Sequence, residues 1–277
     1  MEQTHHTSLD AKLALLLARP GWEWGRLRWA LEGVWRACSP GDRVLDVGCG
    51  RGWLVLSLCQ AGLAGHGVDA DPDAVEASKS CCPGADIRLY DGLHLPYPGS
   101  HFRAVTLIEV LEHVGDEAAV LEEIRRVLVP GGTLVLTTPH AGRWAWLDPD
   151  NYKFRARWAH RAFYRILGRP REYERRFGGS SPVFGNFSPR AHGRLWHRHY
   201  TQEQVEAFAH GFETVATRCE GGFFFSIALV ANYFAEKVFG SWLDSLTALM
   251  RWDARKDRGR DGYALHLVLR RKDQEAG

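Results

Sequence analysis

Three glycines at alternate positions follow a short apolar run, and an acidic residue stands just before them. The residues concerned are Asp46, Gly48, Cys49, Gly50 and Gly52. Glycine there permits positive backbone φ and lets a ligand approach the bare main chain. A dinucleotide-binding loop instead reads G-x-G-x-x-G and holds a pyrophosphate at a helix N-terminus. The G-x-G-x-G spacing behind Asp46, which would repel a diphosphate, favours a ligand with a cationic amino-acid group.

Acidic residues at the ends of the next two predicted strands fit a nucleoside. Asp69, in GVDA, can accept hydrogen bonds from both ribose hydroxyls, and Asp91, in LYDG, would lie beside an adenine amino group. Together with the loop they favour a binding site for S-adenosylmethionine over a purely structural strand-to-helix turn. Cys49 is expected to fill space within the loop. The predicted cofactor-binding residues are Asp46, Gly48, Cys49, Gly50, Gly52, Asp69, Ala70, Asp91, Gly92 and Glu109.

Three residues are predicted to be catalytic: His140, His199 and Glu109. Each follows a strand that should end at the ligand-binding edge of the sheet, or precedes a helix beside that edge. A neutral imidazole can accept a hydroxyl proton at neutral pH, although each histidine could instead order the surrounding loop. Glu112 and His113 lie nearby and could cap the following helix. No metal ligand is predicted.

Composition excludes several classes of protein. The chain has 277 residues, 45% of them hydrophobic and 25% charged, which excludes a disordered or collagen-like protein. A net charge of +2 does not indicate a dedicated nucleic-acid binder. The six cysteines form no C-x-x-C pair and the start shows no secretory pattern, so we expect a cytoplasmic setting. The longest uncharged apolar stretch, 221–235, is too short to span a bilayer but could lie on one.

Apolar runs alternate with helical patterns between about 43 and 138, which is typical of βα units that build a parallel sheet. The fold class is therefore α/β. Two later runs, 211–220 and 263–270, also predict strands. The predicted organisation is N-terminal helices over 1–40, the first part of the core over 41–142, a cap insertion over 143–200, core completion over 201–270 with an apolar helical insertion at 223–252, and a tail over 271–277.

The predicted cap at 143–200 is strongly basic. It carries 13 Lys and Arg against four Asp and Glu, so the rest of the chain is acidic. Aromatic residues lie among the arginines, and the apolar stretch GGFFFSIALVANYF follows. This combination favours an anionic amphiphile or a peripheral membrane contact over nucleic acid, although the apolar stretch could simply pack against the N-terminal helices.

The motifs DVGCGRG, GVDADP, YDGLHLPYPGSHF, EVLEHV and RRVLVPGGTLVLTTP, in this order, resemble the class I S-adenosylmethionine-dependent methyltransferases. The resemblance covers Arg43–His140 and His199–Arg270, with Arg103 where the family usually has Asp. EVLEHV is similar to the ubiquinone-biosynthesis O-methyltransferases, in which related acidic and His positions are linked to a divalent ion. The resemblance implies a Rossmann-like sheet of seven strands, the last antiparallel, with a helical N-terminus and an inserted cap.

Methyl transfer is the activity that this resemblance implies. We expect O-methylation of a hydrophobic or lipid-linked small molecule, because histidines flank the predicted site. An RNA methyltransferase and a non-catalytic S-adenosylmethionine-binding protein are the alternatives. The sequence makes no prediction of the oligomeric state.

Overall fold

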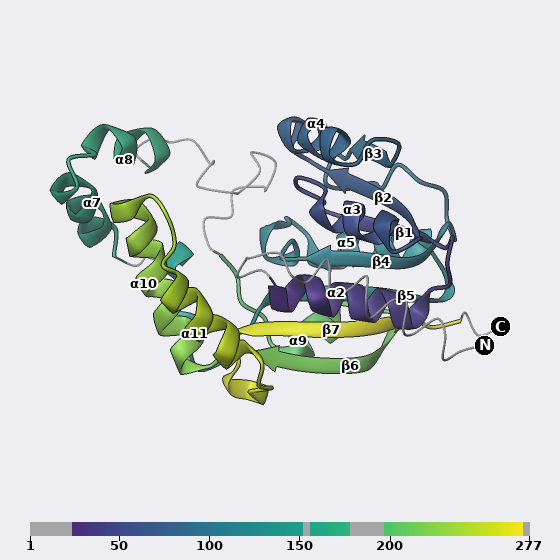
Figure 1. Ribbon diagram of the computed structural model, residues 1–277. Helices are drawn as coiled ribbons and strands as arrows, with labels where there is room; N and C mark the ends of the chain where they lie inside the picture. Colours follow the sequence, from purple (N-terminus) through teal and green to yellow (C-terminus); the bar gives the residue numbers. More distant parts are fainter. Residues whose placement is uncertain (1–23, 152–155, 178–196, 274–277) are drawn as a thin grey trace.

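The computed structural model describes residues 24–151, 156–177 and 197–273, and these form an α/β sheet with a helical cap at one end (Figure 1). The strands are β1 Arg43–Val47, β2 Ala64–Asp69, β3 Asp86–Leu89, β4 Phe102–Ile108, β5 Leu128–Pro139, β6 Phe212–Glu220 and β7 Ala264–Arg271. Their order in the sheet is β3-β2-β1-β4-β5-β7-β6. The first five strands are parallel and β7 runs antiparallel between β5 and β6, as predicted.

Helices cover both faces of this sheet. The helices of the core are α2 Trp24–Ala37, α3 Trp53–Gln60, α4 Pro72–Cys81, α5 Glu117–Val127 and α9 Gln202–Phe208. Alternate residues of each strand face opposite sides, so Val44, Ala104 and Val135 pack under α2 and α3. Their neighbours Leu45, Leu107 and Leu136 pack on the other side under α5 and α9. Burial on both faces explains why these strands read as continuous apolar runs.

Side-chain caps start several of these helices. Asp71 accepts a hydrogen bond from the Asp73 amide at the start of α4. Thr201 and Gln204 form a capping box at the start of α9. Asp116 caps α5 by accepting from the Ala119 amide, so the interpretation of Glu112 and His113 as caps of that helix is wrong.

Short helical turns and four longer helices form the cap. They are η2 Ala145–Leu147, η3 Pro149–Asn151, α7 Arg157–Ile166, α8 Pro170–Phe177, α10 Phe223–Phe239 and α11 Asp244–Ala254, with the turn η4 Gly259–Asp261 leading into β7. The apolar insertion is thus two helices that separate at Gly240, whose φ is 77°. Figure 1 shows α7, α8 and α10 at the end of the sheet toward which the arrow of β4 points.

The N-terminal prediction is covered in part, because α2 is described and residues 1–23 lie outside the described residues. The same holds for residues 152–155 and 178–196 of the basic insertion and for residues 274–277. None of the described helices is long and apolar enough to cross a membrane.

Candidate active site

The glycine loop joins β1 to α3 and leaves one side of its backbone open. Gly48, Gly50 and Gly52 have φ values of 77°, 51° and 79°. A Cβ atom added at Gly48 would lie 2.4 Å from Val110 Cγ2, so this glycine allows the loop to pack on the segment after β4. A Cβ added at Gly50 would meet nothing within 4 Å. The loop therefore offers bare backbone to a ligand at Gly50.

Asp69 ties this loop to the end of β2. Its Oδ2 accepts a hydrogen bond from the Gly50 amide at 2.8 Å, and its Oδ1 accepts from the Asp71 amide at 2.9 Å. A carboxylate has about four lone-pair sites, so both oxygens keep capacity for ribose hydroxyls. The predicted contact Ala70 follows directly. Asp69 thus lies next to the open backbone, as a cofactor site requires.

Asp91 and Gly92 follow β3 at the same edge of the sheet. Asp91 Oδ1 accepts from the amides of Leu93 and His94, each at 2.8 Å. These backbone donors lower the pKa of the Asp91 carboxyl and hold it ionised. The carboxylate is exposed, and a Cβ added at Gly92 would meet nothing within 4 Å, so both residues can face an adenine ring.

Asp46 lies deeper than the sequence suggests. It is buried at the end of β1 rather than at the mouth of the loop, and it accepts a hydrogen bond from Thr106 Oγ1 at 2.7 Å. Burial, opposed by the Thr106 bond and assisted by the charge of Asp69, raises the pKa of Asp46 to about 7. Burial also raises the pKa of the Cys49 thiol to about 12, which agrees with a space-filling role.

Glu109 has an unusual backbone conformation directly after β4. Its φ is 54°, which is rare for a residue with a side chain and is found mainly where function holds the chain under strain. Glu109 Oε1 accepts from Thr137 Oγ1 at 3.0 Å, and Oε2 lies 3.2 Å from Arg26 Nη1. Burial raises the pKa of Glu109 to about 7, although Arg26 opposes the shift.

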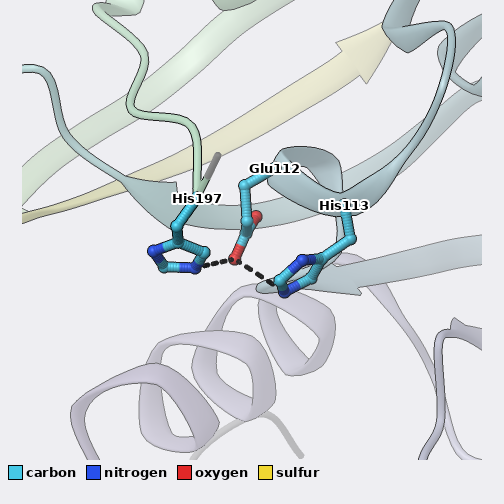
Figure 2. Close-up of side chains that lie close together, drawn as sticks. All are labelled: Glu112, His113 and His197. Atoms are coloured by element: carbon cyan, nitrogen blue, oxygen red, sulfur yellow. Dashed lines mark ion pairs between the residues drawn. The ribbon is translucent and has the colours of Figure 1, made fainter. Parts of the chain in front are cut away.

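Glu112 is a buried carboxylate between two imidazoles (Figure 2). It lies in the turn η1, Leu111–His113. Its Oε2 accepts from Thr138 Oγ1 at 3.1 Å. Its Oε1 lies 3.8 Å from His113 Nε2 and 3.7 Å from His197 Nε2, with no hydrogen-bond partner among the described residues. These three groups therefore converge without filling the space between them.

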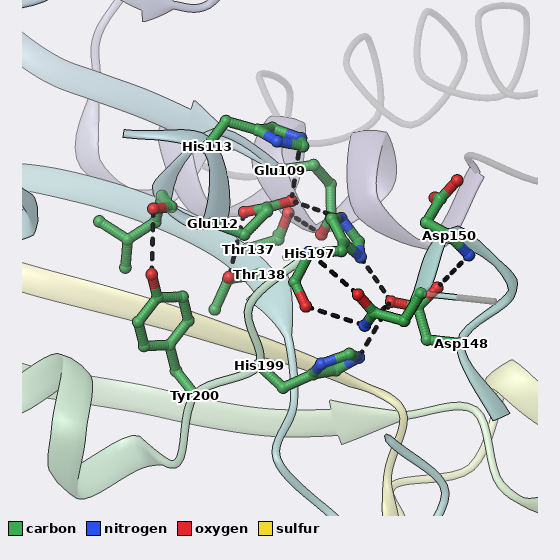
Figure 3. Close-up of polar contacts among 12 residues, drawn as sticks. Glu109, Glu112, His113, Thr137, Thr138, Asp148, Asp150, His197, His199 and Tyr200 are labelled. Carbon is green, nitrogen blue, oxygen red and sulfur yellow. Dashed lines mark hydrogen bonds and ion pairs between the residues drawn. The ribbon is translucent and has the colours of Figure 1, made fainter. Parts of the chain in front are cut away.

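A second carboxylate, Asp148, approaches the same histidine from the cap (Figure 3). Asp148 Oδ2 lies 2.6 Å from His197 Nδ1 and 3.3 Å from His199 Nε2. Burial alone would lower the pKa of His197, but its contact with Asp148 and the nearby carboxylate of Glu112 raise that pKa well above the usual value. The pKa values of both carboxyls are lowered despite their burial, by His197 and by its neighbours His199 and His113. The network joins the core to the cap through alternating carboxyl and imidazole groups.

The three residues predicted to be catalytic do not all lie in this network. His199 belongs to the network and Glu109 lies beside it, since its carboxyl responds to the charges of Glu112 and His197. His140 is buried next to the last strand, where its Nδ1 lies 3.0 Å from the Gly262 carbonyl oxygen. Asp148 was not predicted, because the signals read from its segment were the basic charge and the aromatic residues, and neither indicates an acidic site residue.

The donor atoms around His197 could hold a divalent ion. Glu112 Oε1, His113 Nε2 and His197 Nε2 all lie within 4.8 Å of one another, as do the nearest atoms of Asp148, His197 and His199. Zinc is bound by such nitrogen and oxygen donors at about 2.0–2.2 Å. The first set fits an ion better, because its carboxylate oxygen lacks a donor whereas Asp148 Oδ2 already accepts from Asn151. The expectation that no metal is bound stays a prediction.

Comparison with known proteins agrees with this geometry. Residues 45–136 match the family model described as a methyltransferase domain. The chain is 37% identical over 109 residues to a ubiquinone biosynthesis O-methyltransferase of Xanthomonas campestris pv. campestris, covering 37% of this chain and 45% of that relative. It is 38% identical over 110 residues to the mitochondrial ubiquinone biosynthesis O-methyltransferase of Schizosaccharomyces pombe, covering 37% of this chain and 40% of that relative. The chain thus spans less than half the length of these relatives.

Solved structures extend the comparison across most of the chain. An S-adenosylmethionine-dependent methyltransferase from Mesorhizobium loti matches with a TM-score of 0.53 and 18% identity, covering 91% of this chain and 98% of that one. The [4+2]-cyclase SpnF matches with a TM-score of 0.53 and 19% identity, covering 89% of this chain and 80% of that one. Likeness at this identity establishes the fold, and the cyclase shows that the fold alone does not define the reaction.

Fold and comparisons together define the class: the sheet has the class I methyltransferase fold, and one solved structure that shares it is described as an S-adenosylmethionine-dependent methyltransferase. Within that class, the segment that contains the glycine loop and the turn after β4 is similar to the ubiquinone biosynthesis O-methyltransferases.

Proposed function

We propose that this protein transfers the methyl group of S-adenosylmethionine to an oxygen atom of a hydrophobic small molecule. The observation that carries the proposal is the buried imidazole–carboxylate network at the carboxyl ends of β4 and β5. The network begins two residues after Val110, whose side chain packs on Gly48 of the glycine loop. Groups that bind the cofactor and groups that can move a proton are therefore adjacent.

The cofactor, when bound, supplies an activated methyl group on a sulfonium. Asp69 would accept hydrogen bonds from its ribose, while the loop lets its body lie against Gly50. Asp46 would pair with its ammonium group, and this pairing would ionise a carboxyl that burial otherwise keeps partly protonated. These residues would bind and orient the cofactor. A further group must accept the proton of the acceptor's hydroxyl.

His199 is the residue that we assign as general base. Asp148, 3.3 Å from its Nε2, can hold a proton on that nitrogen and so leave Nδ1 to accept the acceptor's hydroxyl proton. His197 is a poorer base, because Asp148 and Glu112 favour its protonated form and raise its pKa well above the usual value, although burial opposes them. We assign His197 to orienting Asp148. A divalent ion on Glu112, His113 and His197 would lower the pKa of a nearby hydroxyl.

Apolar and aromatic side chains next to His199 favour a hydrophobic acceptor. Tyr263 lies 6.3 Å from His199 and 5.4 Å from Phe225, between ring centroids. Phe223, at the start of α10, contacts Trp144 at 5.0 Å and is half exposed. Tyr263 and Phe225 are themselves buried. An apolar acceptor would therefore lie against Phe223 and Trp144 and would gain about 25 cal/mol per Å² of surface buried there.

Cofactor binding is tested by titrating S-adenosylmethionine, S-adenosylhomocysteine and NAD into the protein in a calorimeter. We expect the first two ligands to bind. Asp69→Ala should weaken that binding by about 1.5–3 kcal/mol, because the ribose hydroxyls lose a charged partner. Asp73→Ala, which removes an exposed acid from α4, is the matched control and should bind normally. Preference for NAD would refute the cofactor assignment.

Catalysis is tested by incubating the protein and S-adenosylmethionine with extracted lipids, a metabolite pool and RNA, then searching for products heavier by one methyl group. With the acceptor found, His199→Ala should lower turnover by about 10²-fold and leave cofactor affinity unchanged. His140→Ala tests the other sequence-predicted base, and His210→Ala, an exposed histidine, is the control. A methylated RNA would establish the alternative function, and binding without any product would indicate a non-catalytic protein.

A further inference from the structure

The outer face of α7 mixes arginines with large apolar side chains. At 100° per residue, Arg161, Arg165 and Trp158 fall within an arc of about 60° on α7, and Ile166 lies about 80° further round on the same exposed side. Trp158 is 81% exposed and Ile166 is 83% exposed. The opposite face is buried through His160 and Tyr164. The exposed apolar residues are therefore not needed to pack α7 against the cap.

The end of α10 lies beside α7 and the residues that follow it. His160 Nε2 lies 2.8 Å from the Tyr233 hydroxyl, and Arg169 Nη1 donates to the Lys237 carbonyl at 3.0 Å. The next two residues of α10 are both exposed, Val238 at 45% and Phe239 at 68%. Figure 1 shows α7 and α8 at the far end of the cap, away from the sheet. We use the term tip surface for the exposed apolar residues Trp158, Ile166, Val238 and Phe239 together with Arg161, Arg165 and Arg171.

The tip surface has more arginines than acidic residues to pair with them. A cavity of about 370 Å³ is lined by Arg161, Arg165, Pro170, Arg171 and Glu174. Arg161 pairs with Glu174 at 2.5 Å. Arg165 and Arg171 form no ion pair within the part of the chain that the structure describes. Two guanidinium groups beside an open cavity can bind phosphate oxygens bidentately.

We propose that the tip surface docks on the headgroup layer of an anionic lipid bilayer, with lipid phosphates at Arg165 and Arg171 and the side chains of Trp158, Ile166 and Phe239 at the boundary between the headgroups and the acyl chains. An anionic bilayer would bind the arginines through its phosphates and would bury the apolar side chains. RNA would use the arginines and leave Ile166 and Phe239 exposed to water. A second copy of the chain would bring arginines against arginines.

The test is flotation of the full-length protein with phosphatidylcholine vesicles and with vesicles that also contain phosphatidylglycerol. Ile166→Asp and Phe239→Asp remove the apolar contacts, and Arg165→Glu and Arg171→Glu reverse the charges. Val215→Asp on β6 and Arg36→Glu on α2 are matched controls, because Val215 is half exposed and the Arg36 side chain is 71% exposed. Inorganic phosphate is added as a competitor, and S-adenosylhomocysteine affinity is measured for every variant.

We expect the protein to float with the anionic vesicles alone and to dissociate as salt is raised. Each reversed arginine should weaken partitioning at least about fivefold, and Phe239→Asp about tenfold, while both controls float normally. Unchanged cofactor affinity in the variants separates this outcome from that of the proposed function. The proposal is overturned if the protein does not float, if all variants float alike, if inorganic phosphate binds where vesicles do not, or if RNA is retained equally after Phe239→Asp.

Discussion

Asp46 is a buried carboxyl that accepts a side-chain hydrogen bond from Thr106, and its burial has a measurable consequence. Its pKa of about 7 lies well above the usual value of about 3.9 for an unfolded chain. Between these two values the folded protein without ligand binds more protons than the unfolded chain. The contribution of Asp46 to the free energy of unfolding therefore falls as pH rises through this window.

Cofactor affinity should change with pH in the opposite direction. A cationic ammonium group requires ionised Asp46, so the affinity for S-adenosylhomocysteine should rise between about pH 5.5 and 7.5. Calorimetric titration over this range provides the measurement. Asp46→Asn should bind weakly and show a flat profile in the same range. An affinity of the wild-type protein that does not vary with pH would contradict the assignment.

Residues differ in how far the sequence could place them. The loop glycines, Asp69 and Asp91 follow strands whose order fixes the ligand edge, so their positions were predictable. The contact between Asp148 and His197 joins residues 49 positions apart. No local pattern specifies such a pair, because the path of the inserted chain determines it. The burial of Asp46 was missed for a related reason: it depends on Thr106 in the neighbouring strand β4.

At the scale of elements, two glycines on either side of α3 share a backbone conformation but differ in their expected role. Gly50 and Gly62 both have positive φ, and a Cβ at either would meet nothing within 4 Å. Gly62 lies in the turn after α3, away from Asp69. Alanine should therefore cost a similar free energy of unfolding at both positions, about 1 kcal/mol, through backbone strain.

Ligand affinity should separate the two variants. Gly50→Ala places a methyl group where the cofactor is expected to lie, so it should weaken S-adenosylhomocysteine binding, whereas Gly62→Ala should not. Urea denaturation measures the common loss of stability, and calorimetry measures the difference in binding. Equal affinity in the two variants would show that the ligand does not approach Gly50.

Element boundaries in the core agree closely with the sequence analysis. The strands predicted at 211–220 and 263–270 are β6, Phe212–Glu220, and β7, Ala264–Arg271. Local sequence signals explain this agreement, since Gly211 and Gly262 lie just before these two strands. The separation of the apolar insertion into α10 and α11 at Gly240 was less visible, because apolar residues continue on both sides of the break.

At the scale of the whole molecule, one buried carboxylate holds the two long cap helices together. Asp253 in α11 is fully buried, and its Oδ2 accepts from the amides of Gly222 and Phe225 at 2.7 and 3.0 Å. Its Oδ1 pairs with Arg258. A side chain of α11 thus provides the acceptor that the first turn of α10 lacks.

Removing this carboxylate should loosen the cap and spare the sheet. Asp253→Ala leaves Arg258 and two amides without their acceptor, a loss of about 3–5 kcal/mol of local stability. Hydrogen–deuterium exchange should show lost protection in α10 and unchanged protection in β1, β4 and β5. Asp244→Ala, an exposed acid in the first turn of α11, is the control and should change little. Uniform loss of protection in cap and sheet would mean that the two unfold together.

The helices α10 and α11 leave and rejoin the sheet at neighbouring points, because Glu220 at the end of β6 pairs with Ala264 at the start of β7. A short hairpin turn could join the same two strands without altering their register. Insertions at such a position can lengthen, shrink or be exchanged during evolution while the cofactor half stays constant. The pairing of Glu220 with Ala264 therefore makes this excursion a natural grafting point, at which acceptor preference could diverge among relatives or be re-engineered by transplanting a different pair of helices.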